Sequence, residues 1–542
     1  MEEEKQPQML KEEVLQQLRS KATELLLREE WKESIQVYSH LISLYQEYLV
    51  NTQEQADSDQ ITKLQKSLCL AYSNRAEARL RLRDYTEAIV DCDQALGIEN
   101  AHLKTIVCKG KILLSLNQYS NALHCFTLAF CDIQNIGNSE SISGYLEVCK
   151  KLEFQSRTGV FDLSDWVLNG FRGKSPELAE YIGSVQIKKS EDCGRGLFAT
   201  KNMEAGTVLL VTKAIATGRG ILPEPDEDSS ETARLVMWKD FVDKVFDAST
   251  KCSKTHRLIS TLSSGANEES LEVSDIRLFR PEAEGGFFMM EKPEMDRILN
   301  ILDVNSLTED AISAKVLGKN GDYYGVGLWI LASFINHSCS PNARRLHIGD
   351  HVLVHTSGDV KAGEEITFAY FDVLLPLKKR REMCKTWGFH CNCKRCRFEE
   401  VFGCREELKE IELALEFGLD NGNMVFRLEE GMRKWMLKGK EKGYLRASFW
   451  SLYSESFRSE KVMRKWGRRI PSMDSIAESI NQAVGGDERV LKVVLEVLKK
   501  NGGGGIVEME RAMKLGRGVY GKVVKKQALR ALFELCSHHQ SH

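Results

Sequence analysis

Apolar residues recur at three- and four-residue intervals through most of the first 150 residues, a spacing that predicts amphipathic helices. A longer period lies over this spacing, in which one aromatic and several small residues return after 34 positions. The recurring pairs are Tyr85 and Tyr119, Ala88 and Ala122, Ala95 and Ala129, and Ala76 and Gly110. A fixed period of this length is typical of stacked helical hairpins, in which small residues let two helices cross closely.

An earlier and less regular copy of the pattern spans residues 18–42 and contains Ala22, Trp31 and Tyr38. The polar run at 51–60 is where we expect the extra residues that separate this copy from the next. The pattern resembles the tetratricopeptide repeat. The resemblance implies three repeats over residues 14–150, about the minimum for a stable solenoid, and a surface for a protein partner. A generic helical bundle is the alternative interpretation.

The pattern changes near residue 180, where short apolar runs bounded by turn residues predict β-strands. An acidic run at 223–233 predicts a loop, and residues 234–318 have mainly helical periodicity. Helical periodicity returns from 405 to the end, interrupted by four glycines that indicate a connector. The expected fold is multidomain α+β, with a helical repeat, a β-rich middle at 180–398 carrying a helical insert at about 223–320, and a helical region at 405–542.

Composition excludes several classes of protein. The 542 residues are 42% hydrophobic and 28% charged, as in ordinary globular chains. The net charge of −3 gives no overall attraction to nucleic acid. There is no apolar run long enough to span a membrane, and the acidic start lacks the core of a signal peptide. We therefore expect a cytoplasmic and/or nuclear protein, whose 15 cysteines serve purposes other than disulfides.

Three motifs in the β-rich region form a set, followed by a CxCxxC group at 391–396. They are Gly194-Arg195-Gly196-Leu197-Phe198, the run FINHSCSPN at 334–342 and the run GEEITFAY at 363–370. In this order and spacing they resemble the SET domain of protein lysine methyltransferases, most closely its SET-and-MYND branch. The resemblance implies a SET domain over 180–398 that ends in a post-SET zinc module at 384–398. With the repeats ahead of it, the chain resembles the repeat-plus-SET arrangement of some eukaryotic methyltransferases.

The resemblance implies that the chain binds S-adenosylmethionine as methyl donor. The residues at matching positions are Gly194, Arg195, Gly196, Asn305, Asn336, His337, Tyr370 and Phe389. A glycine-flanked turn lets backbone approach a ligand closely, although an ordinary β-turn is the alternative. Asn305 also fits a simple helix cap. Asn336-His337-Ser338 matches a glycosylation sequon, which an intracellular location argues against.

Tyr370 is the residue expected to be catalytic. Methyl transfer to lysine is an in-line displacement, so the enzyme mainly positions a neutral amine. Deprotonating a lysine with a pKa of about 10.4 costs roughly 4–5 kcal/mol at pH 7, which a closed apolar channel reduces. A neutral phenol hydroxyl can align that amine by a hydrogen bond. The alternative is a strand tyrosine packed at the edge of the core.

The cysteine cluster predicts a structural zinc site. Such a site needs four soft ligands, and Cys391, Cys393 and Cys396 supply three. The family resemblance implies that Cys339 is the fourth ligand and that the metal fixes the lid over the cofactor. Cys384 is a nearby competitor with unsuitable spacing, as is Cys404. Unbound surface cysteines are the alternative interpretation.

One feature of the SET-and-MYND branch is missing from this sequence. A MYND finger needs a dense set of Cys and His residues, and between 213 and 320 the chain has only Cys252 and His256. We therefore expect a helical insert without a metal. The run Lys378–Arg381 admits two interpretations, a nuclear address or a solvated helix face of the family.

The repeats also carry part of a carboxylate clamp for acidic chaperone tails. Arg19, Asn74 and Lys104 fit this pattern, whereas Thr23 and Cys108 occupy two of its five positions wrongly.

Two functions from different classes follow. The first is a protein lysine methyltransferase that uses S-adenosylmethionine and structural zinc, modifies a lysine of a protein substrate and carries a partner-binding repeat. The second is a repeat adaptor whose SET fold is a catalytically silent scaffold. The complete set of motif residues favours the enzyme. A nucleic-acid reader lacks a basic domain, and acceptor choice depends on loop shapes that sequence does not reveal.

Overall fold

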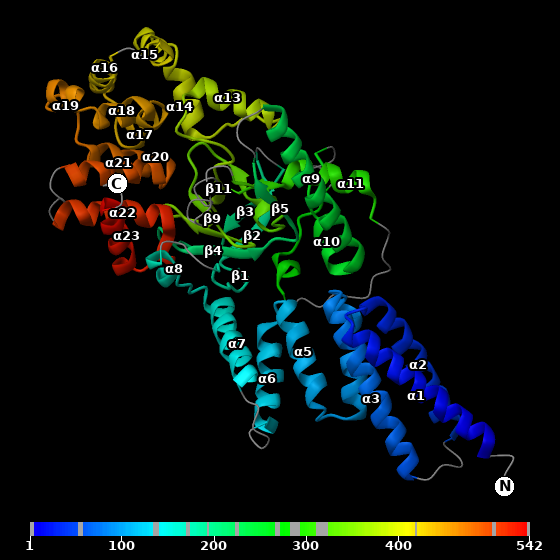
Figure 1. Cartoon of the computed structure of the whole chain (residues 1–542). Helices are drawn as coiled ribbons and strands as arrows, with labels where there is room; N and C mark the ends of the chain where they lie inside the picture. Colours follow the sequence, from blue (N-terminus) through cyan, green and yellow to red (C-terminus); the bar gives the residue numbers. More distant parts are fainter. Residues whose placement is uncertain are drawn as a thin grey trace. The chain divides into compact units, whose positions relative to one another are not determined.

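The structure is a computed structural model, and it describes most of the chain (Figure 1). The described residues are 5–52, 58–133, 140–169, 174–191, 194–222, 227–265, 271–281, 293–309, 323–417, 420–500 and 506–538. They fall into two compact units, one of residues 1–157 with 281–286 and one of residues 158–280 with 287–542. Each unit is described by itself.

The first unit is built from helices that pack as consecutive antiparallel neighbours. They are α1 (Lys5–Leu27), α2 (Trp31–Thr52), α3 (Ser58–Arg81), α4 (Tyr85–Ile98), α5 (Leu103–Ser115), α6 (Tyr119–Ile133) and α7 (Glu140–Thr158). The small residues of the 34-residue period lie at the helix crossings, where Ala22 and Ala76 are fully buried. A Cβ on Gly110 would lie only 2.9 Å from the Phe126 ring. The predicted helical repeat is confirmed.

The extra residues of the first repeat lengthen its helices. Helices α2 and α3 have 22 and 24 residues, against 14 and 13 in α4 and α5. Of the polar run at 51–60, where the extra residues are expected, residues 51–52 end α2, residues 58–60 begin α3, and 53–57 lie outside the described residues. The extra length therefore lies in the helices on either side of this run, since polar residues on helix ends are solvated as easily as those of a loop.

The second unit contains the predicted β-rich region. Its strands are β1 (Tyr181–Ile182), β2 (Val185–Ser190), β3 (Gly194–Ala199), β4 (Val208–Lys213), β5 (Thr217–Ile221), β6 (Leu307–Thr308), β7 (Tyr323–Gly327), β8 (Asn336–His337), β9 (Ala343–Ile348), β10 (His351–Thr356) and β11 (Glu365–Phe368). They form three small sheets with the orders β1-β4-β10-β9, β2-β3-β11-β8 and β5-β7-β6. Alternate residues of β2 and nearly all of β4 are buried, as their apolar patterns predict.

The second of these sheets brings the sequence motifs together. Strand β11 pairs antiparallel with β3, placing Ile366 opposite Leu197. On its other edge β11 pairs parallel with β8, placing Phe368 opposite His337. Residues from three motifs spread over positions 194–370 thus lie on neighbouring strands, and Tyr370 lies two residues after the end of β11.

The described residues of the insert are mainly helical, and they contain α9 (Glu227–Lys251), α10 (Ser253–Ser260), the 3₁₀ turn η2 (Ile276–Phe279) and α11 (Met295–Asn305). The predicted acidic loop at 223–233 is wrong over 227–233, which form the first turns of α9, while 223–226 lie outside the described residues. Acidic residues are favourable in the first turn of a helix, so this composition serves a helix start equally well. Residues 310–322 of the insert also lie outside the described residues.

Helices continue from the cysteine cluster to the end of the described chain. They are α13 (Leu377–Thr386), α14 (Lys394–Phe402), α15 (Glu406–Phe417), α16 (Asn421–Lys434), α17 (Lys440–Ser448), α18 (Trp450–Arg458), α19 (Glu460–Trp466), α20 (Met473–Val484), α21 (Glu488–Lys500), α22 (Ile506–Tyr520) and α23 (Lys526–His538). Figure 1 shows the later of these helices gathered beside the strands. The predicted glycine connector at 502–505 lies outside the described residues.

The C-terminal helices are joined to the sheets by specific contacts. The Ser340 hydroxyl donates to the Ala483 carbonyl at 2.5 Å, and the buried His355 ring contacts the Val519 carbonyl at 3.1 Å. Arg489 forms a bidentate ion pair with Asp372, two residues after Tyr370. The helical repeat, β-rich middle and helical tail together confirm the predicted fold class. Among the described helices, none has both the length and the apolarity that a bilayer crossing requires.

Candidate functional site

A polar cluster forms where β3, β8 and β11 lie side by side. The Asn336 amide nitrogen donates to the Arg195 carbonyl at 3.0 Å and to the Glu365 carboxylate at 2.7 Å. Ser190 donates to the other oxygen of Glu365 at 3.1 Å. A Cβ on Gly196 would lie 2.3 Å from Glu365, so glycine is needed there for the neighbouring strand as well as for any ligand. The sequence motif contained Glu365, but only the pairing of the strands shows its role.

The first motif has an exposed end at Gly194 and a buried side chain at Arg195. Gly194 is exposed and has a φ of 70°, a conformation that glycine adopts without strain. Arg195 is buried, and its guanidinium donates to the Thr261 carbonyl at 2.8 Å and lies 5.3 Å from the centre of the Phe334 ring. The Arg195 side chain therefore attaches the helical insert to the sheet, and the exposed Gly194 precedes it.

Asn305 ends α11 and is buried. Its amide nitrogen donates to the carbonyls of Ser263 and Ile301, both at 2.7 Å. Asn305 thus links the C-terminal end of α11 to Ser263 in another part of the insert, a role close to the predicted helix cap. A contact of this residue with a cofactor stays a prediction.

Aromatic rings surround Tyr370. Its ring centre lies 5.2 Å from that of Trp387, 5.6 Å from Phe368 and 6.0 Å from Phe389. Its hydroxyl donates to the Ile335 carbonyl at 3.0 Å, which fixes the direction of the phenol. Trp387 was not singled out in the sequence because it lies outside the three motifs, at the C-terminal end of α13.

His337 lies between this aromatic group and the cysteines. Its ring is stacked on Phe371 with centres 4.4 Å apart, and it lies 5.4 Å from the ring of Phe389. Its Nδ1 accepts the backbone N–H of Tyr370 at 3.1 Å, and its Nε2 lies 3.3 Å from the Cys339 sulfur. Phe389, predicted to face the cofactor, is half-buried, so part of its ring is open to a ligand.

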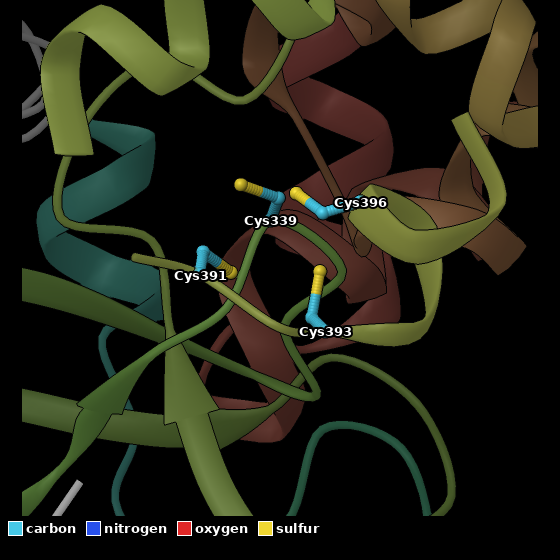
Figure 2. A group of neighbouring side chains, drawn as sticks. All are labelled: Cys339, Cys391, Cys393 and Cys396. Atoms are coloured by element: carbon cyan, nitrogen blue, oxygen red, sulfur yellow. The ribbon is translucent and has the colours of Figure 1, made fainter. Parts of the chain in front are cut away.

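The four predicted zinc ligands converge. The sulfurs of Cys339, Cys391, Cys393 and Cys396 all lie within 4.8 Å of one another. Figure 2 shows the four side chains grouped together. Four sulfurs at about 2.3 Å from one zinc ion are roughly 3.8 Å apart, so the cluster fits a tetrahedral site with little adjustment. Cys384 and Cys404 are absent from the potential metal-ligand groups of the described residues. Neither Cys252 nor His256 of the insert belongs to such a group in that part of the chain.

Hydrogen bonds among the cysteines prepare the cluster for a cation. Bonds from its neighbours, Cys339 first, lower the pKa of Cys391 below its usual range and that of Cys393 to about 6. The pKa values of Cys339 and Cys396 are raised, because these thiols donate hydrogen bonds to the neighbouring sulfurs. Thiolates are therefore favoured at two of the four positions near neutral pH.

A buried charged network surrounds the sulfurs. Arg380 donates to the Cys396 sulfur at 3.1 Å, and Glu399 pairs with both Arg380 and Arg395 at 2.5 and 2.7 Å. The side chains of the two arginines are fully buried, at 0% exposure. The positive charges of Arg380 and Arg395 thus share the single negative charge of Glu399. Thiolate sulfurs beside Arg380 balance the positive charge that is left, which supports a metal site made of thiolates. Ser448 of α17 donates to Glu399 and links the network to the C-terminal helices.

This network corrects the interpretation of the basic run at 378–381. Lys378 and Lys379 are exposed, as a solvated helix face requires, but Arg380 is buried and Arg381 donates to the Cys391 carbonyl at 2.7 Å. Charge content alone does not distinguish solvated from buried arginine, because the difference depends on which helix face meets another element.

Replacement of Asn336 tests the polar cluster. Asn336→Ala removes two hydrogen bonds and leaves the partly buried Glu365 carboxylate short of a donor, which costs about 1–3 kcal/mol of folding stability. We expect weaker S-adenosylmethionine binding by calorimetry, because β3 and β8 lose their tie beside the Gly194 turn. Asn342→Ala is the matched control. The Asn342 side chain also hydrogen-bonds β11, but to the backbone of Glu365 and Thr367 and not to the Glu365 carboxylate. Equal cofactor affinity for the Asn336 variant and the wild type contradicts this role.

Comparison with known proteins agrees with the site. The SET domain family profile matches residues 194–371, from the first motif to the residue after Tyr370. A protein named methyltransferase from Gibberella zeae is 24% identical over 78% of this chain and 58% of its own length. Human histone-lysine N-methyltransferase SMYD3 is 34% identical over 17% of this chain and 23% of its own length. The chain therefore spans less than two thirds of the length of these relatives.

A solved structure is also similar to part of the chain. The TPR2B domain of yeast Sti1, solved in complex with pHsp70, matches 25% of this chain over 96% of its own length, with 18% identity and a TM-score of 0.20.

Residues 194–371 thus match the SET domain family, and a helical repeat precedes them in the chain. Its relatives include SET-and-MYND proteins and protein lysine methyltransferases, so the resemblance predicted from the three motifs is confirmed.

Proposed function

We propose that this protein transfers a methyl group from S-adenosylmethionine to a lysine side chain of a protein substrate. The observation that carries the proposal is the convergence of the three motifs on β3, β8 and β11, with Tyr370 fixed inside a group of aromatic rings. The relatives named as methyltransferases give independent support.

The residues proposed to hold the cofactor fit its chemistry. S-adenosylmethionine, when bound, supplies the methyl group on a cationic sulfonium. The exposed Gly194 turn offers backbone groups to the polar tail, and the half-buried Phe389 ring offers a face to an aromatic base. In this proposal Arg195, Gly196 and Asn336 shape the pocket through the strand contacts described above, and Asn305 holds the insert beside it.

Tyr370 is proposed to act on the acceptor amine. Its hydroxyl donates to the Ile335 carbonyl, so the phenol oxygen has a fixed position, and a phenol oxygen can accept the N–H of an amine. The rings of Trp387 and Phe368 lie beside it, and Tyr370 itself is half-buried. Burial of a lysine side chain among such rings lowers its pKa, because burial disfavours the charged ammonium form. The amine is thereby neutral and aligned before transfer.

Zinc is proposed as a structural ion held by the four cysteines. Bound there, the ion would join the loop after β8, which contains Cys339, to the segment before α14, which contains Cys391 and Cys393, and to Cys396 in the first turn of α14. Phe389 lies two residues before Cys391, so the metal holds the proposed cofactor-facing ring in place.

The helical repeat is proposed as the partner-binding region. Asn74 contacts both Tyr38 and Lys104, at 3.0 and 2.6 Å, whereas Arg19 contacts Tyr45 at 2.5 Å. Lys104 also pairs with Glu77 at 3.0 Å. Two of the three predicted clamp residues are thus in contact, and an acidic peptide has to compete with these internal partners.

Incubation with radiolabelled S-adenosylmethionine and a cell extract tests the function. We expect a labelled protein band whose label is on lysine, as shown by mass spectrometry of the excised band. Protein that binds neither the cofactor nor an acceptor, yet still captures a partner through residues 14–150, supports the adaptor instead and refutes the enzyme.

A further inference from the structure

Both ring nitrogens of His337 form hydrogen bonds. The backbone N–H of Tyr370 can only donate, so the Nδ1 that it contacts at 3.1 Å is the unprotonated nitrogen. In neutral imidazole the proton is then on Nε2, which lies 3.3 Å from the Cys339 sulfur and donates to it. The two contacts fix each other, because a ring that donated from Nδ1 would repel the Tyr370 N–H.

The position of the ring is also fixed by packing. It is stacked on Phe371 at 4.4 Å with an angle of 27° between the planes. His337 itself belongs to β8, whose parallel pairing with β11 holds Phe368 beside it. The imidazole therefore bridges two points, the cysteine cluster and the backbone that follows β11.

We propose that His337 is a positioning residue that couples the four-cysteine site to Tyr370, through Nε2 to Cys339 and through Nδ1 to the Tyr370 backbone. The proposal goes beyond binding the cofactor and rests on the function proposed above. A hydrogen bond to a ligating sulfur stabilises a metal site from outside its ligand set. Loss of the metal lets the Cys339 loop move, and the ring transmits this movement to the residue that aligns the amine.

Three variants separate the two contacts. In His337→Asn the amide oxygen lies near the position of Nδ1 and keeps the acceptor for Tyr370, but nothing reaches Cys339. In His337→Gln the amide reaches the position of Nε2 and keeps the donor to Cys339, but the acceptor is lost. His337→Phe keeps the stacking on Phe371 and loses both contacts.

Two readouts measure the contacts independently of activity. Zinc transfer to a colorimetric chelator reports on the metal site, and hydrogen exchange of the Tyr370 amide reports on the bond to Nδ1. We expect zinc affinity to fall about 10–100-fold in the Asn and Phe variants and to stay near wild type in the Gln variant. We expect exchange of the Tyr370 amide to be about tenfold faster in the Gln and Phe variants and unchanged in the Asn variant.

The coupling itself is read by removing zinc from the wild type. Exchange of the Tyr370 amide then rises, and in His337→Phe removal of zinc adds nothing further. His351→Gln, a change of a half-buried histidine at the start of β10, is the control and leaves both readouts unchanged. Equal behaviour of the Asn and Gln variants overturns the proposal, and this comparison remains decisive if the Phe variant does not fold. Wild-type protein without zinc or turnover contradicts the proposed function, while exchange at Tyr370 is still measured separately.

Discussion

We expect replacement of Tyr370 by Phe to lower the rate of the proposed methyl transfer about 10²–10³-fold, the usual cost of removing one well-placed polar contact from a transition state. The change deletes the hydroxyl that is fixed by Ile335 and keeps the ring contacts with Trp387 and Phe389. Single-turnover methylation of a protein acceptor, measured beside calorimetric cofactor affinity, separates chemistry from binding. We expect a large loss of the single-turnover rate and little change in the affinity for the cofactor.

Stability measurements distinguish this role from simple packing. Loss of the hydrogen bond to Ile335 costs about 1 kcal/mol, far less than the 3–4 kcal/mol that the rate loss represents. Tyr324→Phe, which removes a half-buried hydroxyl from β7, is the matched control and leaves turnover unchanged. Unchanged turnover in the Tyr370 variant removes the residue from the mechanism. If the variant loses folding stability but keeps its turnover, Tyr370 serves only in the packing of the core.

Local sequence patterns predicted those parts of the fold that depend on spacing. The 34-residue period placed Ala76 and Gly110 at helix crossings, where only small residues fit. The apolar runs at β4 and β10 are buried strands, as continuous apolar patterns indicate. The cysteine spacing and the family resemblance together brought Cys339 to a cluster 52 residues later in the chain.

The parts that sequence did not predict depend on contacts between distant elements. Glu365 was visible in its motif, but its role follows from the pairing of β11 with β3 and β8. Arg380 stands in a basic run, and its burial follows from the packing of α13 against the cysteine cluster. The start of α9 was misread as a loop, because polar and acidic residues suit a helix N-terminus and a turn equally well.

Replacing Cys393 by Ser removes one of four metal ligands and should release zinc. Purified wild-type protein is expected to hold about one zinc ion per chain. Cys393 is half-buried, whereas the other three cysteines are buried, so serine fits at this position without a cavity. The variant should therefore fold in every respect except the metal site. Zinc content by atomic spectroscopy and thermal unfolding are the two measurements.

Stability should fall together with the metal, because the free energy of binding to the folded site contributes to folding. We expect a loss of several kcal/mol, or on the order of 10 °C in Tm. Part of that loss comes from Arg380 and Arg395, two buried cations that share Glu399 and rely on the sulfurs for the rest of their balance.

Cys384→Ser is a demanding control, since Cys384 is buried in α13 close to the cluster but is not one of its members. A buried hydroxyl there costs about 1–3 kcal/mol without any loss of zinc. A lower Tm with full zinc content thus marks a packing defect, and a joint fall of Tm and zinc marks a ligand. Wild-type protein that is folded and free of metal contradicts the zinc site. In that case the two buried arginines require other anions near Cys396.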